Sequence, residues 1–321
     1  MKKQTQREKN PYKNSDSNKR YYTYEYYLRK TFGSKCAKIP IDGGFSCPNI
    51  DGTCGRGGCI FCSGDFAPTS SLSIEDQFSA GVSSLSAKWK TDKSIAYFQA
   101  HTNTYAPVCI LKEKFEAALA LPGVVGLNIA TRADCLEDEK LEYLATLAER
   151  TVLTLELGLQ SSNDETAKRI NRGHDFETFA DAVKRIRKAS EKINICVHLI
   201  FGLPGEGFDD MIESARAVAA LEVDQVKLHM LYVMEGTRLG KMFLSGEYFP
   251  IEREEYIKAV AEAIALMPEK TVIARLTGDA SGEGFLAPEW SRRKIAVIND
   301  IDKYMFENNL WQGKNFSCGK E

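Results

Sequence analysis

The sequence of 321 residues lacks any run of about 18 apolar residues, which argues against an ordinary transmembrane helix. Its first residues are polar and charged, without the apolar stretch of a secretory signal. Internal repeats and low-complexity tracts are also missing from the sequence. These absences, with a hydrophobic content of 43%, predict a cytoplasmic globular protein with a sizeable core.

A strong net charge is lacking too, because the formal charge is only −2. The charge is unevenly placed: residues 1–38 hold eleven Lys and Arg against three acidic residues, so the remainder carries −10. This stretch is also rich in tyrosine. Basic groups neutralise phosphates and aromatic rings stack on unpaired bases, so RNA binding is one interpretation. The alternative is a disordered basic tail over 1–20, followed by a helix with a buried tyrosine-rich face.

Short apolar runs alternate with helical patterns along most of the chain. The predicted strands are 36–41, 95–100, 125–130, 152–160, 193–201, 225–232 and 271–276. The predicted helices are 20–33, 73–90, 109–121, 137–149, 175–190, 207–222, 252–267 and 289–311. Such alternation indicates a parallel sheet with right-handed crossovers. We therefore predict an α/β fold, a partial (β/α)6-type TIM barrel with an N-terminal basic extension and a C-terminal helix.

Polar residues interrupt the apolar faces of several predicted strands. In 152–160, leucines share one face while Glu156 and Gln160 share the other, because side chains alternate with period two. Comparable polar positions are Gln99, His101, His198, Lys227 and His229. A purely structural barrel would fill these positions with branched apolar residues. The pattern therefore favours a ligand-filled cavity over a buried polar network that satisfies itself.

Four of the nine cysteines fall close together, at Cys47, Cys54, Cys59 and Cys62. In a chain that keeps its thiols reduced, such a cluster indicates metal binding more than disulfides. The five scattered cysteines read as small buried hydrophobes: Cys36, Cys109, Cys135, Cys196 and Cys318. Four thiolates could hold a structural Zn²⁺, whereas three could hold an iron–sulfur cubane with one iron open. The loop follows the first predicted strand, where barrels place their chemistry, and this position favours the cluster.

The motifs together resemble the radical S-adenosylmethionine (SAM) superfamily. The spacing Cys-x11-Cys-x2-Cys, with Phe61 before the last cysteine, is similar to the Elongator-type branch. From about Tyr22 onward the chain resembles the small bacterial YhcC/YtqA-like proteins. The matching segments are 43–49, 55–59, 156–161, 171–174, 202–206 and 275–279. Their order and spacing together are specific to this group.

The resemblance implies cofactors and their protein ligands. It implies a [4Fe–4S] cluster on Cys47, Cys59 and Cys62, with Cys54 as a bystander, and SAM on the open iron. It also implies a division into the tail 1–20, a core 21–285 with the cluster loop 43–66, and a helical extension 286–321. Residues implied in cofactor binding are Phe61, Gln99, His101, Asn103, Glu156, Gln160, Gly202 and Pro204. Residues expected on the substrate side are Lys227, His229, Arg275 and Asp279.

The same resemblance implies RNA as the substrate, specifically the wobble uridine of tRNA. One reaction would convert a 5-carboxymethylaminomethyl side chain into a 5-aminomethyl group, with electrons from a flavodoxin or ferredoxin. Two alternatives stay open: radical chemistry on a small molecule or protein, and a zinc-stabilised RNA-binding module without catalysis. The acidic body favours a substrate other than RNA, because binding to phosphates requires basic surface.

Overall fold

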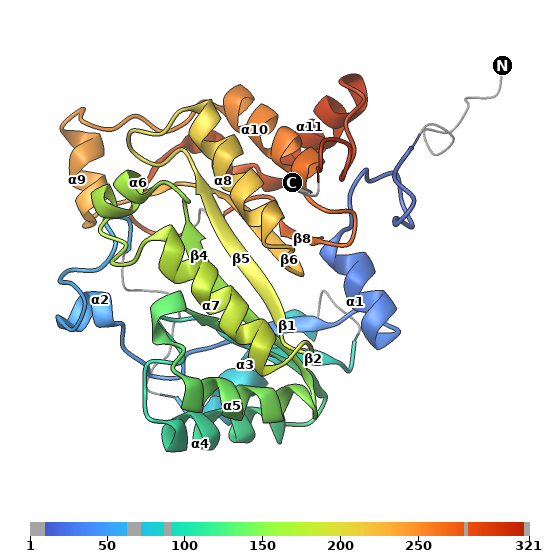
Figure 1. Cartoon of the computed structure of the whole chain (residues 1–321), viewed down its shortest axis with the longest axis vertical. Helices are drawn as coiled ribbons and strands as arrows, with labels where there is room; N and C mark the ends of the chain where they lie inside the picture. The colour runs from blue at the N-terminus through green and yellow to red at the C-terminus, as the bar shows by residue number, and fades with distance from the viewer. Residues whose placement is uncertain (1–9, 63–71, 87–90, 279–281, 318–321) are drawn as a thin grey trace. The chain divides into compact units, whose positions relative to one another are not determined.

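The structure is a computed structural model that describes residues 10–62, 72–86, 91–278 and 282–317. Its strands are β1 (Ala37–Ile41), β2 (Ser94–Phe98), β3 (Val124–Thr131), β4 (Val152–Gln160), β5 (Asn194–Phe201), β6 (Gln225–Met230), β7 (Val233–Met234), β8 (Val272–Arg275) and β9 (Phe285–Ala287). Its α-helices are α1 (Tyr24–Phe32), α2 (Pro48–Asp51), α3 (Ile74–Ser86), α4 (Val108–Leu119), α5 (Asp138–Ala148), α6 (Asp164–Arg169), α7 (Phe176–Ala189), α8 (Phe208–Ala220), α9 (Arg238–Leu244), α10 (Arg253–Leu266) and α11 (Lys294–Glu307). Figure 1 labels these elements.

Seven strands form one sheet in the order β1-β2-β3-β4-β5-β6-β8, and β7 and β9 pair separately. The pairs β1–β2, β2–β3, β3–β4 and β6–β8 are parallel. Sheet neighbours follow one another in the chain, so helices connect them as crossovers. The predicted α/β fold with six or seven strand–helix units is confirmed.

The first helix differs from its prediction. It was expected over 20–33 and begins at Tyr24. Residues before it are extended, because Ile273 N donates to Tyr22 O at 2.8 Å and Thr23 forms a parallel bridge with Ile273. The side chain of Gln312 also accepts from Tyr22 N at 2.8 Å. Pairing with β8 therefore takes the residues that the helical pattern included.

The chain divides into two compact units, which we describe separately. Unit 1 comprises Met1–Tyr27, Gln160–Ile170 and His198–Glu321, and unit 2 comprises Leu28–Leu159 and Asn171–Val197. Strands β1 to β4, apart from Gln160, lie in unit 2, whereas β6 to β9 lie in unit 1. Strand β5 passes from unit 2 into unit 1 between Val197 and His198.

Unit 2 builds its core between the strands and the helices α3 and α4. In α4 the buried residues Val108, Leu111 and Phe115 recur at helical spacing. The ring of Phe115 meets that of Phe98 on β2 edge-on, with 4.9 Å between centroids. Helices α4 and α5 lie side by side, as Figure 1 shows. This packing supports β1, β2 and β3, and residues of the candidate site follow these strands.

Unit 1 packs α8 and α11 against α10. The fully buried Tyr256 of α10 donates to Leu228 O at 3.2 Å and to Leu276 O at 2.9 Å, which ties this helix to β6 and to the end of β8. The predicted C-terminal helix is present as a 3-10 turn at Glu289–Arg292 followed by α11. Within the described residues, none of the helices has the length and apolarity required to cross a membrane.

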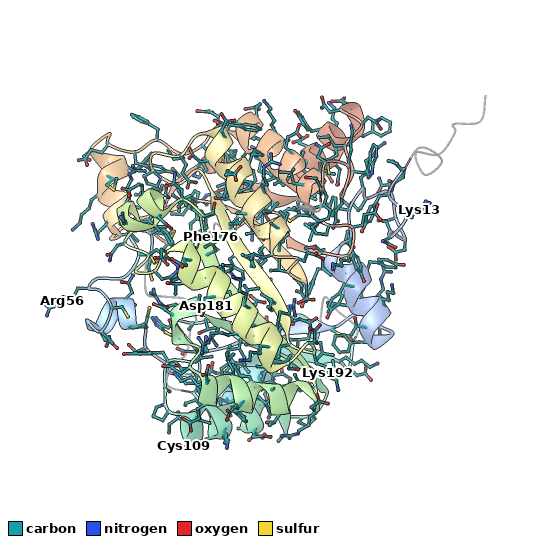
Figure 2. The ribbon with its side chains drawn as sticks, in the orientation of Figure 1. Lys13, Arg56, Cys109, Phe176, Asp181 and Lys192 are labelled. Carbon is teal, nitrogen blue, oxygen red and sulfur yellow. The ribbon has the colours of Figure 1, made fainter. Side chains whose placement is uncertain are left out.

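Two further sequence interpretations concern the N-terminal tail and the scattered cysteines. Residues 1–9 of the expected tail and Cys318 fall outside the described part of the chain. From residue 10 the chain is an ordered part of unit 1, since the buried Tyr12 donates its hydroxyl to Glu269 O at 2.9 Å. Cys36, Cys135 and Cys196 are buried as expected. The prediction is wrong for Cys109, which is exposed on α4, as Figure 2 shows.

Candidate active site

The cysteine loop begins with a one-turn helix whose ends the sequence specifies. Cys47 is the N-cap residue of α2, with φ −137° and ψ 129°. Pro48 occupies the first helical position, where its missing N–H costs nothing. Gly52 ends the helix in the left-handed region at φ +99°. The carbonyl of Cys47 accepts from Ile50 N at 2.8 Å. Cys47 is thereby held at a rigid turn.

The second half of the loop contains two more of the predicted ligands, Cys59 and Cys62. Gly57 and Gly58 both have positive φ, and a Cβ on Gly58 would lie 3.9 Å from Cys62 Sγ. Cys62 N donates to Cys59 O at 2.9 Å and closes a turn. Cys47, Cys59 and Cys62 are half-buried, whereas Cys54 is exposed. Burial therefore distinguishes the three predicted ligands from the predicted bystander.

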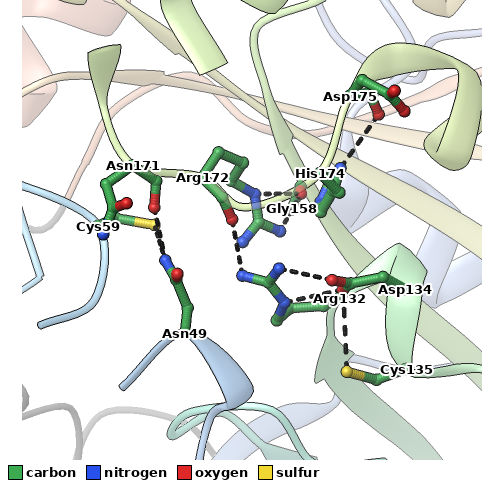
Figure 3. Close-up of polar contacts among 10 residues, drawn as sticks. All are labelled: Asn49, Cys59, Arg132, Asp134, Cys135, Gly158, Asn171, Arg172, His174 and Asp175. Carbon is green, nitrogen blue, oxygen red and sulfur yellow. Dashed lines mark hydrogen bonds and ion pairs between the residues drawn. The ribbon is translucent and has the colours of Figure 1, made fainter. Parts of the chain in front are cut away.

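Two buried arginines lie beside this loop, and the sequence analysis did not select them (Figure 3). Arg172 donates through Nε to Gly158 O of β4 at 3.1 Å, and its backbone oxygen accepts from Arg132 Nη1 at 2.8 Å. Arg132 is paired with Asp134 through bonds of 2.8 and 2.6 Å. The signal for Arg132 and Asp134 was their position directly after β3, where parallel strands place functional groups.

Burial and neighbouring charges set the protonation of this group. Burial lowers the pKa of Arg172, while the charge of Cys59 acts to raise it. For Arg132, burial also acts to lower the pKa, but Asp134 outweighs burial and the pKa is raised. Burial acts to raise the pKa of Asp134, and Arg132 holds it below the usual value. The charge of Cys47 also favours both cationic guanidinium groups.

His174 follows in the same segment. Burial, and then the charge of Arg172, lower its pKa to about 4, so the ring is neutral at pH 7. Its Nδ1 lies 3.1 Å from Asp175 O. A carbonyl oxygen only accepts, so Nδ1 carries the proton. The Nε2 acceptor is buried and has no partner among the described residues.

After β2, the predicted cofactor residues have different environments. Phe61, Gln99 and His101 are half-buried, and His101 has a left-handed φ of +57°. Asn103 is fully buried and donates through Nδ2 to Ala130 O at 2.8 Å, as well as to two backbone oxygens of its own loop. Its amide nitrogen therefore fixes the loop onto β3. Its Oδ1 is buried and lacks a partner within the described segments.

Strand β4 carries Glu156 and ends at Gln160. Glu156 is 1% exposed, and its Oε1 accepts from Asn128 at 2.8 Å and forms an ion pair with Lys38. Part of the polar interior thus satisfies itself, as the alternative interpretation expected. Gln160 belongs to unit 1, with φ +75° and a buried Oε1 that is unpartnered in the described chain. The following helix, α6, is capped by the side chain of Asn163, which accepts from Glu165 N and Thr166 N.

The turn after β5 in unit 1 brings backbone close to side chains. Gly202 has φ +84°, and a Cβ there would lie 2.8 Å from Ile251 Cγ2. Its carbonyl accepts from Tyr248 Oη at 2.8 Å. The buried Pro204 accepts through its carbonyl from Arg169 Nη1, also at 2.8 Å. Contacts on both sides therefore fix this turn.

The predicted substrate residues lie on the later strands of unit 1. Lys227 of β6 is buried and aligned with the half-buried Arg275 of β8. His229 is half-buried, and its ring lies 5.5 Å from that of His198. Asp279 falls outside the described residues. The structure thus groups Lys227 and Arg275 as register partners and His229 with His198.

These observations fit the implied cofactors. A cubane held by three thiolates is anionic, and Arg132 and Arg172 place buried positive charge near the thiols of Cys47 and Cys59. SAM needs polar partners and close backbone approach. The unpartnered oxygens of Asn103 and Gln160 and the left-handed turn at Gly202 provide such features within their respective units.

Comparison with known proteins covers nearly the whole chain. Residues 50–218 match the radical SAM superfamily, and residues 223–307 match the radical SAM C-terminal domain. The uncharacterized protein YtqA of Bacillus subtilis is 44% identical over 311 residues, which are 96% of each protein. A tRNA uridine(34) acetyltransferase of Methanocaldococcus infernus is 30% identical over 158 residues, 48% of this chain and 29% of that enzyme.

A solved structure shows the same fold. Elp3 of Methanocaldococcus infernus, with residues 1–46 deleted, matches with a TM-score of 0.66 at 20% identity. The match covers 86% of this chain and 64% of the Elp3 chain. This likeness confirms the predicted partial barrel.

Proposed function

This chain belongs to the radical SAM superfamily, in its Elongator-type branch, and on this basis we propose that Cys47, Cys59 and Cys62 hold its cluster. It is an enzyme that uses a [4Fe–4S] cluster and SAM. When bound, these supply a 5′-deoxyadenosyl radical, formed by one-electron cleavage of SAM, that removes a hydrogen atom from the substrate. The electron comes from an external reductant, for which we propose a flavodoxin or ferredoxin.

One observation carries the cluster assignment. The three half-buried cysteines lie in a loop whose helix cap and glycines are conformationally specified, while Cys54 is exposed. A four-thiolate zinc site would require Cys54 to turn inward with the others. The buried Arg132 and Arg172 also suit an anionic cluster.

We assign the SAM contacts by their place in the fold. Gln99 and His101 would hold the methionine end of SAM, on a loop that Asn103 fixes to β3. Phe61, directly before Cys62, would shield the cluster from water.

Residues at the ends of β4 and β5 complete this assignment. Glu156 and Gln160 would contact the ribose and methionine portions of SAM. The turn containing Gly202 and Pro204 would accept the flat adenine, because its left-handed glycine leaves backbone accessible.

We propose that the substrate is the wobble uridine of tRNA. The archaeal relative named for tRNA uridine(34) supports this, as does the basic, tyrosine-rich start of the chain. In that region, Tyr24 and Tyr27 stack with 5.9 Å between centroids and both stay partly exposed. Exposed stacked rings of this kind suit contacts with unpaired bases.

The proposed reaction converts a 5-carboxymethylaminomethyl group into a 5-aminomethyl group. The substrate would lose a hydrogen atom from the CH₂ between nitrogen and carboxylate, and then one electron, which would return to the cluster and replace the electron first supplied by the reductant, leaving an iminium. Water adds to the iminium carbon, the C–N bond breaks, and the amine and glyoxylate are released. SAM is the two-electron oxidant and ends as methionine and 5′-deoxyadenosine, so the step balances.

Lys227, His229, Arg275 and Asp279 are the proposed substrate-side residues. Lys227 and Arg275 are aligned on neighbouring strands and would hold the side-chain carboxylate or a phosphate. His229 would move a proton during water addition.

The test compares wobble nucleosides of tRNA from cells with and without the protein by mass spectrometry. We expect 5-carboxymethylaminomethyl-type nucleosides to accumulate without it. Reconstituted enzyme with SAM and dithionite should then convert that tRNA and release glyoxylate and 5′-deoxyadenosine. An unchanged nucleoside profile would reject tRNA and favour a small molecule or protein substrate.

A further inference from the structure

Two asparagines of unit 2 hold the cysteine loop (Figure 3). Asn49, inside α2, donates through Nδ2 to Asn171 O at 2.5 Å and to Cys59 Sγ at 3.8 Å. Asn171 donates through Nδ2 to Arg56 O at 3.2 Å and to Gly58 O at 2.7 Å. We call Asn49 and Asn171 the asparagine clasp. It joins the loop to a segment more than a hundred residues away.

The geometry of the clasp is specified by its surroundings. Asn49 is 1% exposed, and its Nδ2 faces a carbonyl oxygen, which fixes the orientation of the amide. A Cβ on Gly55 would lie 2.2 Å from Asn49 Oδ1, and one on Gly173 would lie 3.2 Å away. Asn171 has φ +56°, which asparagine adopts more readily than most residues. Gly55 and Gly173 therefore leave room for the Asn49 side chain, because neither has a Cβ.

We propose that Asn49 is a positioning residue that orients Cys59 and tunes the reduction potential of the cluster through an N–H···S hydrogen bond. Hydrogen bonds to ligand sulfurs favour the more negative, reduced state and so raise the potential. Asn171 holds the Asn49 side chain and the backbone of the cysteine loop in place. This inference depends on the proposed role of Cys59 as a cluster ligand.

The experiment is a redox titration of the reconstituted full-length protein without SAM, followed by electron paramagnetic resonance. Asn49→Ala and Asn49→Asp remove the N–H donor. Asn194→Ala is the control, because in the described part of the chain the Asn194 amide bonds to Leu153 O of β4 alone. We expect both Asn49 variants to keep their iron but to shift the reduction equilibrium several-fold to tenfold toward the oxidised cluster. A tenfold shift corresponds to about 59 mV for one electron. A potential equal to that of the wild type would overturn the inference.

Asn171→Gly tests the second half of the clasp. It keeps the positive φ and the carbonyl that accepts from Asn49, but it removes the bonds to Arg56 O and Gly58 O. We expect a near-normal potential but a several-fold faster loss of iron in air. Wild-type air stability would contradict the role of Asn171.

Separate outcomes identify which proposal fails. If the wild type binds no cluster, or Cys59→Ala keeps it, the proposed function fails. If the wild type binds the cluster and Cys59→Ala loses it, but the Asn49 variants have the wild-type potential, only the proposed role of Asn49 fails. If the Asn49 variants assemble no cluster, the contact between Asn49 and Cys59 is tested by cysteine alkylation of the apo-protein. The exposed Cys54 serves as the internal reference. Cys59 should then react several-fold faster in Asn49→Ala, and an unchanged ratio would refute the contact.

Discussion

At the scale of single residues, burial and hydrogen bonding separate groups that look alike in the sequence. Cysteine spacing placed Cys47, Cys54, Cys59 and Cys62 in one loop, and only the resemblance to the radical SAM superfamily singled out three of them as predicted ligands. Arg132 and Asn49 were not selected from the sequence, and each donates to a backbone oxygen, Arg172 O or Asn171 O, that lies 40 or more residues away. Such pairings depend on tertiary structure, which a local pattern does not encode.

His174 should make stability depend on pH. Its folded pKa of about 4 is below the ordinary 6.5, so the unfolded state binds more protons between these values and stability falls as pH decreases through this window. From pH 7.5 to 5.5 the loss from this residue is about 1 kcal/mol. Between these two pH values, the His174→Gln variant should lose about 1 kcal/mol less unfolding free energy than the wild type, as measured by denaturant unfolding. Equal losses in both proteins would show that the ring titrates normally.

At the scale of elements, the alternation of apolar and polar residues predicted all seven strands of the main sheet. It gave no ranges for β7, β9, α2, α6 and α9, which are too short to establish a period. The first helix was placed too early because Tyr22 and Thr23 pair with β8 instead. Long elements bury enough surface to follow their own pattern, whereas short ones are determined by their tertiary contacts.

The turn after β5 offers a comparison between two glycines with positive φ. Gly202→Ala would strain the backbone and also place a Cβ 2.8 Å from Ile251 Cγ2, whereas Gly236→Ala, at φ +78°, has open space. We expect a loss of unfolding free energy of about 1 kcal/mol at Gly236 and roughly 2–4 kcal/mol at Gly202. Urea unfolding measures both losses. Equal losses of unfolding free energy in the two variants would mean that the Ile251 side chain moves away from the new Cβ at no energetic cost.

At the scale of the whole molecule, the fold class followed from the sequence, but the division into two units did not. Unit 1 contains three separate stretches of chain, which only long-range contacts join. Gln312 is an example, because its buried side chain accepts from Tyr22 N and donates to Pro268 O and Thr271 O, both at 2.6 Å. Nothing around Gln312 in the sequence indicates these partners.

Gln312→Ala should therefore destabilise unit 1 more than a surface change does. It removes the side-chain partner of Tyr22 N and Thr271 O, which costs roughly 3 kcal/mol, whereas Pro268 O still accepts from Thr271 N at 3.0 Å. Asn308→Ala is the matched control, since among the described residues its exposed side-chain amide bonds to Tyr304 O alone. Thermal unfolding should separate the two variants, and hydrogen exchange should increase at residues 20–23. Similar melting temperatures for both variants would disprove this role.

The most direct test of the cluster assignment is the iron and acid-labile sulfide content of anaerobically reconstituted protein in two cysteine variants. Cys54→Ala should keep four irons per chain and still form 5′-deoxyadenosine from SAM with dithionite, as expected for a three-cysteine cubane. Cys59→Ala should lose both the cluster and this product. Iron retained in Cys59→Ala, or zinc bound by all four thiolates of the wild type, would contradict the account.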